Sequence, residues 1–150
     1  MRALIAGLLV AVAAAGCSNA FHPAVVGPLV TIERHGGLCS ESECRALVEI
    51  KSDGSVFRQV PRVEAIGRLS AEDLEQLQLA IANTDFAVIR ARPFTGTCPI
   101  AFDGQETIYT FTTPAASARL ASCEVAIDLG QQPFVTLNRA LENAAVTSHW

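Results

Sequence analysis

The chain has 150 residues, of which 15 are acidic and 11 basic, so its net charge is −4, and half of its residues are hydrophobic. This length suffices for one domain with a sizeable core. The acidic balance excludes the basic surface that nucleic-acid binding requires. The chain also lacks the polybasic cluster that draws a domain onto anionic lipid.

The first residues have the pattern of a signal peptide. Met1 and Arg2 precede 13 residues, 3–15, without a charge or a proline. Because a membrane-spanning helix needs about 20 apolar residues, this segment is too short to span but has the length of a signal-peptide core. We expect residues 1–16 to be removed. The mature chain then carries 10 basic residues against 15 acidic ones.

A cysteine follows this segment directly. Ala14-Ala15-Gly16-Cys17 resembles a bacterial lipobox, although leucine or valine is more usual where Ala14 stands. The resemblance implies that Cys17 becomes the N-terminus and carries acyl chains, which would anchor the protein to a membrane. The location expected is the outer membrane in an organism with two membranes, and otherwise the outer face of the plasma membrane. The alternative is an ordinary secretory signal cleaved near Ala15 or Ala20.

Four further cysteines remain when Cys17 is set aside. Outside the cytoplasm thiols are expected to pair, and four cysteines allow three pairings. Sequence positions favour Cys39–Cys44 and Cys98–Cys123. A zinc site is the competing interpretation, but the cysteine spacing lacks a matched second pair and the histidines are scattered, at positions 22, 35 and 149. We predict no metal and no cofactor.

The mature chain divides into a lipid-proximal tether, one domain and a frayed tail, at residues 17–27, 28–146 and 147–150. Within the domain, residues 29–34 are rich in β-formers and are expected to form the first strand. Residues 45–52 alternate, with Ala46, Val48 and Ile50 on one face, and residues 56–60 return as a partner strand.

Turn and helix signals follow. Asp53-Gly54 predicts a tight turn between the two strands, and Pro61 ends the second one. Ser70 and Asp73 have the spacing of a capping box, so we expect a helix there. Its apolar stripe is Leu74, Leu77, Ala80 and Ile81, and Asn83 ends it; after it, Phe86, Val88 and Ile89 are expected to enter the core.

The second half repeats the order of strands and helix. Residues 90–104 read as a long connection, residues 106–113 as a strand and residues 118–127 as its partner, with Cys123 on the second strand. Pro133 is placed to occupy the first position of a last helix. The apolar spacing of that helix comes from Phe134, Leu137 and Leu141.

These elements predict an α+β domain, in which an antiparallel sheet of two hairpins, with about 4–5 strands, packs two helices on one face. Each half has an Asp-Gly pair before a strand and a helix at its end, which agrees with a ββα repeat. Since Asp-Gly turns are common, coincidence explains the likeness equally well.

Half of the mature chain resembles a family of small bacterial envelope proteins whose domain has no known function. The resemblance is carried by GGLCSESECRALVEIKSDGSVFRQV and GRLSAEDLEQLQLAIANTDF. It implies that Cys39 and Cys44 lie in a glycine-rich loop, that Asp53 and Gly54 form the hairpin turn, and that Ser70 and Phe86 bound the helix. The resemblance implies no enzymatic activity.

The function that this pattern favours is non-enzymatic: a lipid-anchored domain that contacts another envelope protein or the cell wall. Its expected contact surface is the two cysteine-bearing loops, 36–44 and 95–104, because bridged loops lose little entropy on binding. Five residues are the candidates for contact: Glu41, Ser42, Glu43, Asp103 and Tyr109. The first alternative is an inhibitor of a secreted or periplasmic hydrolase.

The second alternative is an enzyme that acts on cell-wall glycans. Glycosidases use two carboxylates, and the pairs available are Asp103 with Glu106 and Glu124 with Asp128. Turn and strand-end positions explain these carboxylates without catalysis. Glu33 and His35 alternate onto one strand face and could form a small polar site, for which a solvated strand edge is the simpler interpretation. The sequence contains no nucleophile motif, so we assign no catalytic residue.

Overall fold

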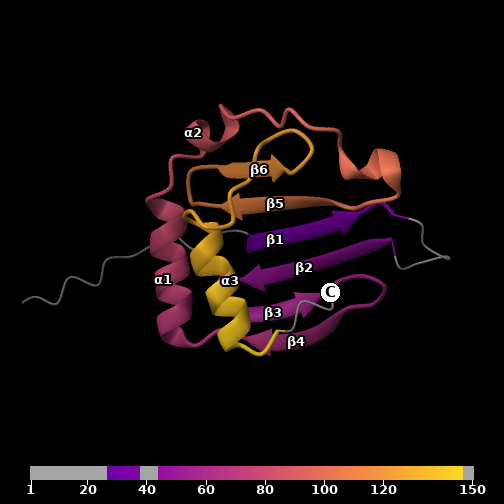
Figure 1. The fold of residues 1–150 in the computed structure, drawn as a ribbon. Helices are drawn as coiled ribbons and strands as arrows, with labels where there is room; N and C mark the ends of the chain where they lie inside the picture. Colours follow the sequence, from indigo (N-terminus) through magenta and orange to yellow (C-terminus); the bar gives the residue numbers. More distant parts are fainter. Residues whose placement is uncertain (1–26, 38–43, 147–150) are drawn as a thin grey trace, which may run out of the picture.

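The computed structural model describes residues 27–37 and 44–146. They form an α+β domain with one antiparallel six-stranded sheet in the order β4-β3-β2-β1-β5-β6 (Figure 1). The strands are β1 (Pro28–His35), β2 (Arg45–Lys51), β3 (Ser55–Arg58), β4 (Glu64–Arg68), β5 (Glu106–Thr112) and β6 (Ser117–Ala121). The helices are α1 (Ala71–Ala82), α2 (Phe86–Arg90) and α3 (Phe134–Asn143), and a 3₁₀ turn, η1, spans Pro99–Phe102.

The predicted fold class is confirmed, and the sheet is larger than expected. The first half of the chain contributes four strands and the second half two. The strand that the sequence analysis missed is β4, an edge strand in which only Ile66 and Gly67 are partly covered. A short edge strand has no alternating apolar face, so its sequence carries little β signal.

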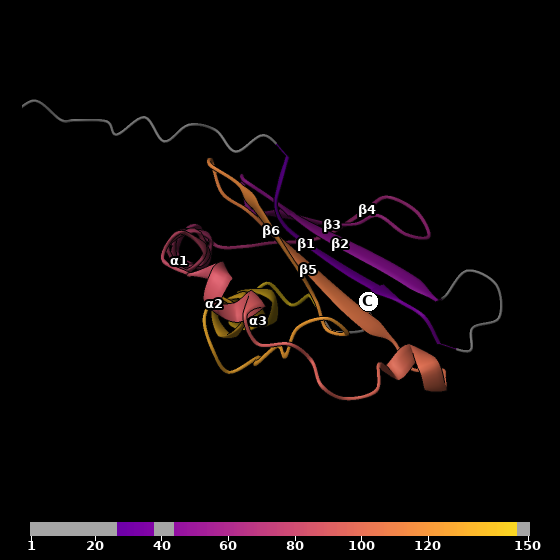
Figure 2. The same ribbon diagram turned by 90° about the horizontal axis from the view of Figure 1, so that it is seen from above.

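All three helices lie on the same face of the sheet (Figure 2). The core between them and the sheet contains Val30, Ile32, Val48 and Ile50 from β1 and β2, together with Leu77 and Leu137 from α1 and α3. The alternation of β1 and β2 therefore directs one apolar side of each strand toward the helices. Within the described parts of the chain, no helix is long and apolar enough to cross a membrane.

Four aromatic rings fill the middle of this core. Phe134 meets Tyr109 and Phe111 edge to face, with ring centroids 5.1 and 5.6 Å apart, and Phe86 stacks on Phe111 at 5.4 Å. Edge-to-face and offset contacts are the favourable arrangements for such rings. Phe134 and Phe111 are both fully buried.

The helix signals were accurate, with local corrections. Ser70 Oγ accepts a hydrogen bond from Asp73 N at 3.0 Å, as the capping box predicts. Val88 was expected in the core, but it is 59% exposed, because residues 86–90 form a short helix that turns only Phe86 and Ile89 inward. Pro133 lies at the N-cap of α3, one residue before the predicted position.

The second hairpin is shorter than predicted. β6 ends at Ala121, so Cys123 lies in the turn that follows the strand and not on the strand itself. The shift is caused by Ser122, whose hydroxyl accepts from Thr107 N at 3.0 Å and whose own N–H donates to Thr107 O at 2.9 Å. This pair closes the ladder and lets the chain turn.

Candidate functional site

The register of the three central strands brings three polar residues to one end of the sheet. His35 is paired with Arg45 on β2 and with Glu106 on β5. His35 and Glu106 are 71 positions apart in the sequence, and only the antiparallel ladder makes them neighbours. At the opposite end of β1 the chain enters the domain at Pro28.

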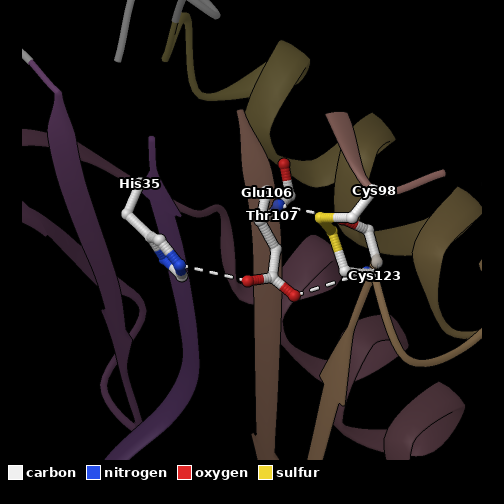
Figure 3. Close-up of a disulfide and its surroundings, with 6 residues drawn as sticks. His35, Cys98, Glu106, Thr107 and Cys123 are labelled. Atoms are coloured by element: carbon white, nitrogen blue, oxygen red, sulfur yellow. Dashed lines mark hydrogen bonds and ion pairs between the residues drawn. A yellow bond between two sulfur atoms is a disulfide. The ribbon is translucent and has the colours of Figure 1, made fainter. Parts of the chain in front are cut away.

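Glu106 is the centre of this cluster, although it is a buried carboxylate with only 8% of its surface exposed. One of its oxygens lies 3.0 Å from His35 Nε2, and the other accepts a hydrogen bond from Cys123 N at 3.3 Å (Figure 3). A buried carboxylate is tolerated only when such partners replace water. Glu106 therefore ties the end of β1 to the turn after β6.

The side chain of His35 links β1 to Glu106 on β5. Its Nε2 bonds to Glu106, while its Nδ1 is buried without a hydrogen-bond partner. Among the described residues, this imidazole therefore bonds to no serine hydroxyl and no cysteine thiol that it could activate as a nucleophile. Glu33, on the same strand face as His35, accepts from Arg45 Nε at 3.0 Å. The solvated strand edge that the sequence favoured for these two residues is wrong, because β1 pairs with β2 on one side and with β5 on the other.

The disulfide Cys98–Cys123 stands beside Glu106 and confirms the predicted pairing (Figure 3). It joins residues 25 positions apart and brings their Cα atoms within 5.0 Å. Next to it, Phe94 N donates to Glu124 O at 3.0 Å and Ala126 N donates to Arg92 O at 2.8 Å. Covalent and backbone bonds together close the base of the 95–104 loop.

Residues 99–104, at the end of this loop, form a compact turn that we call the tip. Ala101 N donates to Cys98 O at 3.0 Å and Gly104 N donates to Pro99 O at 2.8 Å, so η1 is closed by its own backbone. Asp103 completes the turn in the left-handed region, with φ 59°. The tip presents apolar surface, since Phe102 is 76% exposed and Ile100 is 39% exposed.

Gly36, where the 36–44 loop begins, lies against the 95–104 loop at this end. A Cβ atom added to Gly36 would lie 2.9 Å from Gly104 O and 3.0 Å from Ile100 Cγ1, so the backbone after β1 packs directly against the tip. Only glycine suits this approach, since Gly36 also has φ +93°. We call this region the braced end, and define it as His35, Gly36, Glu106, the Cys98–Cys123 bridge and residues 99–104.

The candidate contact residues differ in exposure. Asp103 is exposed on the tip, as expected. Tyr109 is not available for contact, because it is only 8% exposed and lies on β5 among the core aromatics, where burial raises the pKa of its phenol. Glu41, Ser42 and Glu43 lie outside the described residues.

The remaining cysteines can be placed only in part. Cys44 is disulfide-bonded. Its predicted partner Cys39 and the predicted lipidation site Cys17 lie outside the described residues, so both assignments remain predictions.

Three of the four candidate glycosidase carboxylates have local structural partners. Glu124 forms an exposed ion pair with Arg119 at 3.2 Å, and Asp128 accepts from Gly130 N at 2.9 Å within a turn. Glu106 is occupied as described above. Among residues 27–37 and 44–146, no group of three or more His, Cys, Asp or Glu side chains could hold a metal ion.

Two distinctive features of the braced end were not predicted from the sequence. One is the bond between His35 and Glu106, which depends on strand register. The other is Phe102, whose neighbours Pro99, Asp103 and Gly104 are turn formers and could have marked it as the apolar residue of an exposed turn.

Comparison with known proteins gives no relative. No family model, no curated protein and no solved structure matches this chain.

Proposed function

We propose that this protein is a lipid-anchored cell-envelope protein with a non-enzymatic binding role. The anchor is supported by the apolar segment 3–15 and by the lipobox-like residues before Cys17. Acyl chains on Cys17 would hold the domain at a membrane outside the cytoplasm, and two or more chains make such attachment stable.

The contact surface in this proposal is the braced end. The observation that carries it is the close packing of Gly36, the first residue of the 36–44 loop, against Gly104 and Ile100 of the 95–104 loop. A surface that is ordered before binding loses little conformational entropy in a complex. The partner would be another envelope protein or the cell wall.

The polar residues of this end support binding better than turnover. Glu106 satisfies His35 and the Cys123 backbone at the same time, so its burial has a structural explanation. A glycosidase would need one carboxyl group free to protonate the leaving group and a second one facing it.

The anchor is tested by feeding cells an alkyne-labelled fatty acid. The wild-type protein should take up the label, and Cys17→Ala should abolish it. An unlabelled wild-type protein would refute the anchor.

The contact surface is tested with a photo-activated cross-linking amino acid in intact cells. It is placed at Gln105, beside the tip, or at Gln78 on α1, which is a matched control because both glutamines are exposed. We expect a discrete adduct from position 105 only. Equal adducts from both positions, or none from either, would contradict the proposed surface.

An inhibitor of a secreted hydrolase is the second candidate, and the tip favours it. Phe102 and Asp103 put an exposed aromatic ring and a carboxylate side by side on a closed turn, which is a shape that can enter an active-site cleft. Purified protein should then slow a lysozyme-like enzyme or a protease. Undiminished rates across such a panel would remove this candidate.

A further inference from the structure

The direction in which the tip points follows from the path of β1. The chain enters the domain at Pro28 and reaches the braced end at His35, seven residues later. An eight-residue strand spans about 26 Å at 3.3 Å per residue. The start of β1 lies at the end of the sheet opposite to η1 (Figure 1). The lipid attachment at Cys17, on which this inference rests as part of the proposed function, would join the domain at that end.

The chemistry of the tip disfavours a lipid surface. Residues 95–105 contain no lysine or arginine, and their one charge is the carboxylate of Asp103. Peripheral segments that settle on anionic membranes carry basic side chains, because the lipid surface is negative. An exposed phenyl ring next to a carboxylate is better matched to a protein pocket that is apolar inside and basic at its rim.

The backbone of the tip is fixed before any partner arrives. None of the η1 residues is buried, yet the turn is closed at its base by Cys98–Cys123 and supported from the side by Gly36. Aromatic side chains on ordered backbone, in contact with a pocket, are the usual dominant residues of interfaces.

We propose that Phe102, with Ile100 beside it, is the anchor residue of a docking surface that faces away from the membrane. It enters an apolar pocket on a partner protein, and Asp103 meets a basic group at the rim of that pocket.

The orientation is tested with the full-length lipidated protein in phosphatidylcholine and phosphatidylglycerol vesicles whose acyl chains carry bromine, a short-range quencher. In a Trp150→Phe background, which removes the single native tryptophan, one variant has Phe102→Trp and another has Ala20→Trp, three residues after Cys17. We expect bromine to quench emission at position 20 and to leave position 102 unchanged.

Each other result has a distinct meaning. Quenching at position 102 equal to that at position 20 would show that the tip enters lipid, and would overturn the inference while the anchor stands. Absence of quenching at position 20 would show that the protein is not held at the membrane, so the proposed anchor itself would fail.

The pocket is tested by photo-cross-linking from position 102 in intact cells. Val63 is the matched control, since it is 68% exposed and lies before β4 at the far edge of the sheet. We expect one discrete adduct from position 102, none from position 63, and loss of the adduct when Asp103→Lys is added.

Three outcomes would contradict the proposed pocket on a partner protein. They are an adduct that survives Asp103→Lys unchanged, equal adducts from both positions, and an adduct that collapses on lysozyme digestion, which would identify a glycan in place of a protein.

Discussion

The helix-covered core and the braced end are stabilised by different interactions. In the core, Phe111 and Phe134 are fully buried and contact other rings, so removal of apolar surface from water dominates. At the braced end no residue of η1 is buried, and the chain is held by a disulfide, a buried carboxylate and a glycine contact. An exposed surface can thus be ordered without a core beneath it.

The largest effect is expected from Phe134→Ala, because it empties the centre of the aromatic cluster. Truncation of a buried phenylalanine costs about 3–5 kcal/mol of the free energy of unfolding. The matched control is Phe102→Ala, which removes the same side chain from a site that is 76% exposed and should leave stability nearly unchanged. Urea unfolding of both variants measures the difference, and equal losses would contradict the contrast between the regions.

Removal of the Cys98–Cys123 bridge should have the next largest effect. The bridge closes a loop of 25 residues, and loops of about this length give about 3 kcal/mol of stability through restriction of the unfolded chain. We expect the double substitution Cys98→Ser and Cys123→Ser to lower the free energy of unfolding by that amount. Local disorder should appear first at residues 95–104.

Hydrogen exchange locates this change. Amides of residues 95–104 should lose protection in the double variant, while those of α1 and β2 keep theirs relative to global unfolding. Uniform loss throughout the domain would mean that the bridge supports the core and does not specifically order the tip.

The sequence predicted the core better than the braced end for a physical reason. The β-forming residues of β1, the alternation in β2, the turn at Asp53-Gly54 and the cap at Ser70 are local signals, since each is encoded within a few neighbouring residues. β4 escaped detection because an edge strand has little apolar face to display. Gly67 within it is explained by the distant residues Val146 and Ala144, since a Cβ there would lie 2.6 Å from Val146 Cγ2 and 3.3 Å from Ala144 O.

The braced end depends instead on contacts between distant residues. The Cys98–Cys123 bridge could be predicted because four cysteines allow few pairings. The bond of His35 to Glu106 could not, because it requires the register of β1 with β5, and a shift by one residue would turn either side chain to the other face.

The contact between the two loops can be measured with a pair of glycine variants. Gly36 and Gly27 both have positive φ, so Gly→Ala strains the backbone at either position, by about 1–2 kcal/mol. A new Cβ at position 27 has nothing within 4 Å, whereas one at position 36 would press on Gly104 and Ile100. We expect Gly36→Ala to lower the unfolding free energy more than Gly27→Ala does. Equal effects would show that Gly36 does not pack against Gly104 and Ile100.

The smallest effect should come from the hairpin turn at the Pro28 end of the sheet, where an exposed carboxylate orders the chain. Asp53 accepts from Ser55 Oγ at 2.5 Å and from Ser55 N at 3.0 Å, and Arg68 adds a bond at 3.2 Å; the Ser55 bonds are the main reason that the pKa of Asp53 is lowered to about 2. Since the unfolded chain titrates near the ordinary value of about 3.9, the stabilisation is complete above that pH and is lost as the pH falls toward 2.

Wild type should therefore lose its advantage in unfolding free energy over Asp53→Asn across this pH window, as measured by urea unfolding at each pH. Ser55→Ala should move the Asp53 pKa, followed by carboxyl NMR, back toward its ordinary value, and an unmoved pKa would mean that Arg68 is the controlling partner.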